Sequence, residues 1–130
     1  MLYLQKNYDM EEFIFEKLAV WQKSCDLVAQ VYQQIDKLPD TEKFALCNQI
    51  RRAIVSVPSN IAEGSGRASA KEKIHFIEIA YGSLMETYCQ LTVAVKLGYL
   101  SEENAMALRP QFTEVAKMLS GWRNNLKSKL

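Results

Sequence analysis

The sequence predicts an all-α fold, an antiparallel up-down-up-down four-helix bundle, and three observations lead to this prediction. Four segments repeat apolar residues every three or four positions, which places those side chains on one face of a helix. No segment shows convincing alternation of apolar and polar residues, so no sheet is predicted. The predicted connections are only a few residues long, and short connections between long helices make sequence neighbours antiparallel.

The four apolar stripes define the predicted helices. They run over residues 14–35, 47–61, 74–95 and 105–126. Each stripe continues for at least two heptads, long enough to cover one side of a helix and to fill the inside of a bundle.

The residues between the stripes are typical of helix ends. Leu38-Pro39-Asp40 separates the first two helices, and Gly64-Ser65-Gly66 ends the second. Ser69 with Glu72 forms the sequence pattern of a capping box, which predicts the start of the third helix. Gly98 is a predicted C-cap, and Ser101 is the predicted N-cap of the fourth helix. Pro110 falls within the fourth helix, where we expect a kink or a split.

Length and composition indicate one domain of ordinary globular type. The chain has 130 residues, of which 48% are hydrophobic and 24% charged, with a formal net charge of +1. A charge so close to zero gives no general argument for nucleic acid or for an anionic membrane. We expect residues 1–12 to form an N-terminal arm or a strap onto a neighbour, and residues 13–130 to form the bundle.

The cysteines and the hydropathy pattern predict a cytoplasmic protein with no membrane partner. Cys25, Cys47 and Cys89 are far apart and form no CxxC pair, so neither a zinc site nor a redox motif is predicted. Thiols on apolar helix faces suit a reducing compartment. No apolar run approaches the roughly 18 residues of a membrane span, and the start of the chain does not read as a signal peptide.

A polar stripe follows the second helix on the side away from its apolar stripe. It consists of Gln49, Arg52, Ser56, Ser59 and Glu63. Such a stripe is either a solvated face or a surface that meets another subunit, with Asn60 and Glu63 supplying hydrogen bonds. Pro58 interrupts the same helix and removes the bond to the Ile54 carbonyl, so we expect Ser56 or Ser59 to satisfy freed backbone groups.

The third helix carries Gly82-Ser83, followed by Glu86. Glycine inside a helix costs up to about 1 kcal/mol, and close packing of a neighbouring backbone is the usual compensation. We expect Glu86 to pair with Arg51 or Arg52. Further apolar residues lie off the main stripes and would leave a large apolar patch on a monomer, which predicts self-association. These residues are Val31, Leu46, Val55, Phe76, Ile79, Val93 and Leu97.

The inventory of reactive side chains argues against catalysis and against a cofactor. Glu72-x-x-His75 matches half of a di-iron motif, but the chain has one histidine and that site needs two such motifs. A Ser-His or Cys-His pair would have to be built on His75 itself, and no partner is evident. Gly64-Ser65-Gly66-Arg67 lacks the GK[ST] of a phosphate loop and is predicted to be a turn.

Basic residues are concentrated between positions 51 and 73. They are Arg51, Arg52, Arg67, Lys71 and Lys73. A solvated charged face explains such a cluster, and the alternative is a weak patch for RNA or DNA. The acidic first helix and the near-neutral total charge count against nucleic acid.

Several motifs resemble the bacterial four-helix proteins related to those encoded by intervening sequences of 23S ribosomal RNA genes. The resemblance covers about residues 15 to 126. It rests on Phe15-x-x-Leu18-x-x-Trp21, Gln49-Ile50-Arg51-Arg52-Ala53, Ser56-Val57-Pro58-Ser59-Asn60-Ile61-Ala62-Glu63-Gly64, Phe76, Ala80, Gly82-Ser83-Leu84, Glu86 and Leu97-Gly98-Tyr99-Leu100.

The resemblance implies an antiparallel bundle, a homopentamer, no catalysis and an association with RNA or DNA. The same superfamily includes the accessory protein of diversity-generating retroelements, a pentameric, basic, nucleic-acid-binding barrel. The motif and interface residues implied here are Ser56, Pro58, Ser59, Asn60, Glu63, Gly64, Gly82, Ser83 and Glu86. We therefore expect a non-enzymatic oligomeric scaffold that associates weakly with RNA or DNA, and the alternative is a purely protein-binding module.

Overall fold

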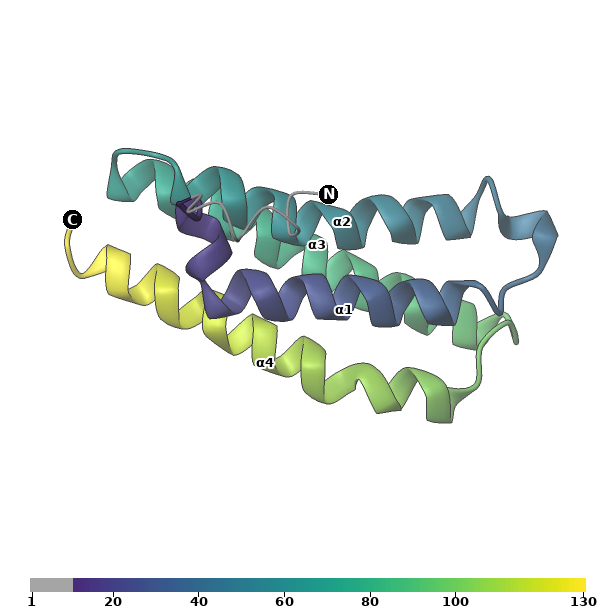
Figure 1. Ribbon diagram of the computed structural model, residues 1–130. Helices are drawn as coiled ribbons and strands as arrows, with labels where there is room; N and C mark the ends of the chain where they lie inside the picture. The colour runs from purple at the N-terminus through teal and green to yellow at the C-terminus, as the bar shows by residue number, and fades with distance from the viewer. Residues whose placement is uncertain (1–10) are drawn as a thin grey trace.

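The computed structural model describes residues 11–130, and the predicted arm of residues 1–12 lies almost entirely outside that range. Four helices make up most of the described chain (Figure 1). They are α1 (Ala19–Ile35), α2 (Leu46–Ser65), α3 (Ala70–Lys96) and α4 (Glu102–Lys127), with 3-10 turns η2 (Ile14–Lys17) and η3 (Asp40–Glu42). No strand occurs between residues 11 and 130, so the all-α prediction is confirmed for this part of the chain.

Each helix packs against two others. α1 contacts α2 and α4, and α3 also contacts α2 and α4. The apolar stripes meet between the four helices, where Leu27, Ile54, Leu84 and Leu119 are fully buried. Burial of such side chains is the main stabilising contribution to a helical core, at about 1.5–3 kcal/mol for each one.

The predicted helix ends in the second half of the chain are confirmed. The Glu72 amide donates to the Ser69 hydroxyl at 3.1 Å, and the Asn104 amide donates to the Ser101 hydroxyl at 3.0 Å. Gly98 has φ +78°, and the Tyr99 amide donates to the Ala94 carbonyl at 2.9 Å. This last bond is the Schellman pattern, in which glycine takes the left-handed position after the helix.

The first quarter of the described chain differs from the sequence prediction. The first stripe was expected to be helical from Ile14, but the helix is interrupted at Leu18, whose φ −79° and ψ 123° are extended. Ile14 lies in η2 and is 65% exposed. The short turn lets the Phe15 ring pack edge-on against the Trp21 ring, with 4.9 Å between the ring centroids. In a continuous helix these two side chains, six residues apart, would point in different directions.

The first connection is longer than expected and has its own structure. It runs from residue 36 to residue 45 and contains η3. Glu42 organises it, because its carboxylate accepts from the Leu46 amide at 3.2 Å and from the Tyr99 hydroxyl at 3.4 Å. A carboxylate at this position satisfies a free amide in the first turn of α2 and suits the positive end of the helix dipole.

Both internal prolines are accommodated in continuous helices. Pro58 lies inside α2 and Pro110 inside α4, and neither helix is split. Of the two outcomes expected at Pro110, a kink or a split, the split does not occur. Pro110 is exposed, so water can bond the carbonyl that its ring leaves free.

Candidate functional site

A chain of hydroxyl and amide groups joins α2 to α3 near the middle of the two helices. The Ser56 and Ser83 hydroxyl oxygens lie 2.9 Å apart. The Asn60 side-chain amide donates to the Ser56 carbonyl at 2.8 Å and to its hydroxyl at 2.9 Å, and the Thr87 hydroxyl donates to the Ser83 carbonyl at 2.8 Å. We call Ser56, Asn60, Ser83 and Thr87 the polar seam.

The polar seam leaves one donor and one acceptor unpaired within the described residues. The Ser56 hydroxyl accepts from Asn60, and either hydroxyl of the Ser56–Ser83 pair can donate the bond between them. One of the two hydroxyl protons and the Asn60 carbonyl oxygen have no hydrogen-bond partner among residues 11–130. Ser56, Asn60 and Ser83 are all half-buried, so these groups lie at the edge of the α2–α3 contact.

Side chains bond backbone carbonyls on both sides of Pro58. The Ser59 hydroxyl donates to the Val55 carbonyl at 2.9 Å, and the Asn60 side-chain amide donates to the Ser56 carbonyl. The prediction that Ser56 or Ser59 satisfies the carbonyl freed by Pro58 is not met, because that carbonyl belongs to Ile54 and no side chain in the described range bonds it. Side chains that bond carbonyls near a proline stabilise a locally weakened helix.

Gly64 sets the closest approach of α2 and α3. A Cβ atom at this position would lie 2.9 Å from the Phe76 Cβ and 3.5 Å from the Lys73 carbonyl oxygen. The Lys73 ammonium group also donates to the Ser65 carbonyl at 3.0 Å, at the C-terminal end of α2. A cation there suits the helix dipole, so the α2–α3 contact is close and held at its end.

A second heptad stripe runs along α3 beside the core stripe, and two of its residues, Phe76 and Ser83, contact α2. It consists of Phe76, Ile79, Ser83, Glu86, Gln90, Val93 and Leu97. Ile79 is 38% exposed, Val93 41% and Leu97 55%. This outer stripe is apolar at both ends and polar in the middle, a pattern with which helical interfaces fix register.

Several predicted interface residues differ from their expected surroundings. Val31 is fully buried in the core, so it is no part of a surface patch. Gly82 is exposed, and a Cβ there would meet nothing within 4 Å, so no backbone among residues 11–130 packs against it.

The predicted ion pairs also differ from expectation. Within residues 11–130 Glu86 pairs with neither Arg51 nor Arg52, because Arg51 reaches the Lys43 carbonyl at 3.5 Å and lies over the Tyr32 ring. Glu63 is exposed and pairs with Arg67 at 3.4 Å.

The five basic residues do not form one continuous patch. Arg51 and Arg52 lie in the first half of α2, whereas Arg67, Lys71 and Lys73 surround its far end; at 1.5 Å per residue, position 51 is about 24 Å from position 67. Arg51, Arg67 and Lys73 have the intramolecular contacts given above. Arg52 and Lys71 are exposed and make no hydrogen bond or ion pair with residues 11–130.

A groove between α3 and α4 was not predicted from the sequence. Its volume is about 650 Å³, and Tyr88, Phe112 and Met85 make up much of its apolar wall. The Arg109 guanidinium donates to the Tyr88 hydroxyl at 3.3 Å, and Lys117, at the same groove, forms no ion pair with residues 11–130. Tyr81 and Tyr88, which were assigned to the core, pack against it but are only half-buried.

No group of side chains suited to metal binding occurs in the described residues. No three His, Cys, Asp or Glu residues of this range gather as metal ligands, and His75 is exposed beside Phe76. Burial raises the pKa of the Cys25 thiol and of the Cys47 thiol, so both are poor nucleophiles. None of the helices between residues 11 and 130 has the length and apolar content needed to cross a bilayer.

Comparison with known proteins agrees with the fold. The 23S rRNA-intervening sequence protein family matches the chain over residues 16–121. A crystal structure of a protein of unknown function from the S23 ribosomal protein family of Bacteroides thetaiotaomicron is similar, with a TM-score of 0.72 and 23% identity. The likeness covers 81% of this chain and 98% of that one, and at this identity it concerns the fold alone. No curated protein matches the chain.

Proposed function

Because the chain belongs to the 23S rRNA-intervening sequence protein family, we propose that it is a non-enzymatic scaffold built from several copies of one bundle. In this proposal each subunit is an antiparallel up-down-up-down bundle, and five subunits form a ring. The number five comes from the family resemblance, whereas the surface that would join the subunits is argued from the structure.

The observation that carries the proposal is the outer stripe of α3. Three of its apolar side chains, Ile79, Val93 and Leu97, are each more than a third exposed, although they repeat at the heptad spacing of a packed helix. Ser83 of the polar seam lies between them, half-buried and bonded to Ser56. Gly82 is open to a close approach from another chain. These features favour packing of a second copy along α3.

A ring of subunits requires a head-to-tail interface, in which the outer stripe of α3 meets a different surface of the next copy. Such an interface closes when the rotation per subunit divides a full turn. The polar centre of the stripe would set the register, because an unpaired hydroxyl or amide inside an apolar contact costs about 1–3 kcal/mol.

Light scattering behind a sizing column tests the proposal. We expect a mass near five times 14.9 kDa for the wild type. Ile79→Lys together with Val93→Lys should dissociate the assembly, since two buried charges are costly in an apolar interface. Thr92→Lys adds a lysine at an exposed α3 position off the stripe and should leave the mass unchanged. A wild type of 14.9 kDa would contradict the proposal.

Weak association with RNA or DNA is a second candidate, and the free side chains of Arg52 and Lys71 favour it. A ring repeats each of them once per subunit, so several weak phosphate contacts could act together. The wide separation of the basic residues within one subunit counts against strong binding by a monomer. Binding of this kind would show little sequence preference and would fall steeply with salt.

Titration of structured RNA and duplex DNA at about 50 and 200 mM salt, where phosphate-driven affinity changes steeply, measures this candidate. Arg52→Glu with Lys71→Glu should abolish binding at the lower salt, because it replaces two positive charges that would contact phosphates with negative ones. Neither substitution removes a hydrogen bond or ion pair within the described chain, so the fold should be unaffected. Lys37→Glu with Lys96→Glu changes two other exposed lysines and serves as the matched control. If the wild type does not bind at the lower salt, a purely protein-binding scaffold is the surviving alternative.

A further inference from the structure

We propose that the acidic segment before η2 of one subunit binds in the α3–α4 groove of the next subunit. This leader segment consists of residues 11–14, with the sequence Glu-Glu-Phe-Ile, and it ends at the first residue of η2. The inference rests on the proposed self-association, and it adds a second contact with its own residues. It concerns two surfaces that are exposed in the single subunit.

The leader segment presents apolar side chains to solvent. Phe13 is 63% exposed and Ile14 65%, although each is a large apolar residue. The Phe13 amide donates to the Glu16 carboxylate at 3.0 Å, so the backbone is held on its own subunit at this point. Exposed apolar side chains on an anchored backbone are suited to reach a neighbour with little loss of conformational entropy.

The groove offers the complementary chemistry. Its apolar wall suits side chains such as Phe13 and Ile14, and its two charged lining residues, Arg109 and Lys117, are both basic. Its lining contains no aspartate or glutamate. Glu11 and Glu12 are exposed, and neither forms an ion pair within residues 11–130. Opposite charges at the rim of an apolar contact set its orientation and its specificity.

The groove is also open enough to admit a chain. Its volume of about 650 Å³ lies in the range of sites that hold sizeable ligands. Gly121 lines it, and a Cβ at that position would meet nothing within 4 Å. A peptide backbone can therefore approach α4 closely at Gly121.

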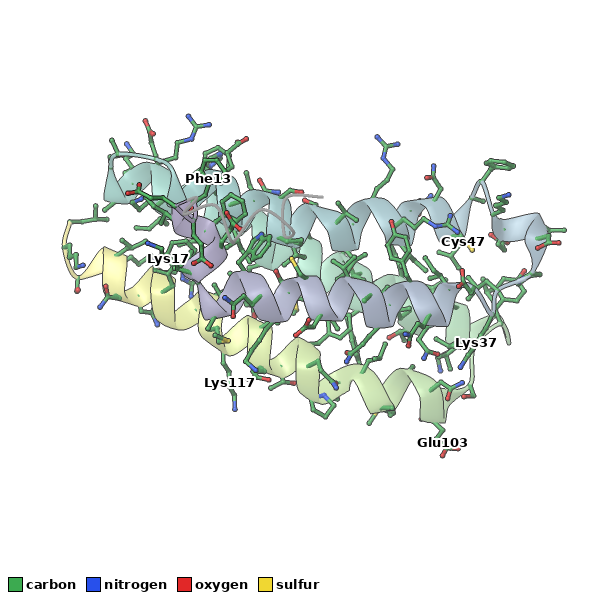
Figure 2. The ribbon with its side chains drawn as sticks, in the orientation of Figure 1. Phe13, Lys17, Lys37, Cys47, Glu103 and Lys117 are labelled. Carbon is green, nitrogen blue, oxygen red and sulfur yellow. The ribbon has the colours of Figure 1, made fainter. Side chains whose placement is uncertain are left out.

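The geometry favours binding between subunits over binding within one. η2 packs against α1 and α2, whereas the groove lies between α3 and α4. Figure 2 shows Phe13 beside α2 on one side of the bundle and Lys117 projecting away from α4 on the other. A leader on one surface and a groove on the opposite surface form a head-to-tail pair, the kind of contact that a ring needs.

Disulfide trapping tests the inference on the full chain. Cys89 is exposed and lines the groove, so Glu12→Cys places a second thiol where the leader should meet it. Under mild oxidation we expect a ladder of covalent oligomers on a denaturing, non-reducing gel. The ladder should disappear when Cys89→Ser is added. Lys37→Cys puts an exposed thiol at the far end of the bundle and should give no ladder above the wild-type level.

A charge exchange tests the same contact without a covalent bond. Lys117→Glu should weaken self-association on the order of fivefold, and Glu12→Lys in the same chain should restore it, because rim ion pairs contribute modestly. The inference is overturned if the assembly has the expected mass and Glu12→Cys gives only monomers, or if the exchange does not restore affinity. In either case the proposed function stands. A monomeric wild type would overturn both.

Discussion

Gly64 and Gly82 both lie inside long helices, yet they meet opposite surroundings. Gly64 is buried where α2 crosses α3, and a Cβ there would come within 2.9 Å of Phe76. Gly82 is on the solvent side of α3, and a Cβ there would touch nothing. Glycine weakens a helix at either position, but only at Gly64 does the subunit itself gain a close contact in return.

α3 carries apolar residues on two faces. Its inner face fills the core with Ile77, Leu84 and Leu91, each at most 1% exposed. Its outer stripe has the same heptad spacing, and Ile79, Val93 and Leu97 on it are each more than a third exposed. A helix that is apolar on two sides suits a position between its own bundle and a neighbour. Substitutions on the two faces should therefore separate folding from assembly.

The largest contrast is expected between Leu84→Ala and Ile79→Ala. Leu84→Ala should lower the free energy of unfolding by about 2–5 kcal/mol, because it leaves a cavity in a fully buried site. Ile79→Ala should change the same quantity in the dissociated subunit by about 0.5 kcal/mol or less, as for most surface substitutions. Urea unfolding at low protein concentration measures both, and equal losses would contradict the two-face interpretation.

Gly64→Ala should cost about 1–3 kcal/mol of unfolding free energy, because the added methyl group overpacks the contact with Phe76. Gly66→Ala is a suitable control, since a Cβ there meets only the Glu63 carbonyl at 3.7 Å. Thermal unfolding of the two variants side by side is sufficient. A Gly64→Ala protein as stable as the control would mean that α2 and α3 can separate without cost.

Asn60→Ala should lower the free energy of unfolding by about 1–1.5 kcal/mol, because it removes the bonds to the Ser56 carbonyl and hydroxyl. Glu63→Ala, which removes only an exposed pair with Arg67, should cost under about 0.5 kcal/mol. Both residues belong to the motif between Ser56 and Gly64. Comparable losses for the two, measured by urea unfolding, would show that Glu63 has a structural contact absent from the single subunit.

The smallest change in unfolding free energy is expected from Gly82→Ala, and the sign of that change is informative. Removing glycine from an exposed helical position should raise the unfolding free energy of the subunit by up to about 1 kcal/mol. The same methyl group should weaken self-association if another chain packs there. Circular dichroism on the dilute protein and light scattering on the concentrated protein give the two values. Stabilisation with unchanged assembly would place the interface elsewhere.

The helices were predictable because their signals are local. Apolar spacing, Ser69, Ser101 and Gly98 each act within a few residues, so their effects can be inferred from sequence alone. The exception at Leu18 has a tertiary cause, the contact between Phe15 and Trp21. Helix periodicity alone contains no information about that contact.

The candidate site was only partly predictable for the same reason. The motif around Pro58 indicated where hydroxyl and amide groups would gather, and the structure brings Ser56, Asn60 and Ser83 together there. Whether the basic residues from Arg51 to Lys73 form one patch depends on the length of α2, which separates them, and on which of their side chains already contact other residues. Neither can be inferred from the spacing of the basic residues in the sequence. The groove could not be predicted, because a tyrosine in an apolar stripe has the same sequence spacing whether the neighbouring helix covers it or leaves it partly exposed.

The close α2–α3 contact also has a consequence for the order of folding. Only residues 66–69 join these two helices, and Gly64, Phe76 and Lys73 meet directly across the turn. Pairs so near in sequence lose little entropy on closure, so this hairpin is the part best able to fold early. α1 packs against α4 as well as α2. During synthesis on the ribosome, α1 must therefore wait for the last helix to emerge before its apolar face is fully covered.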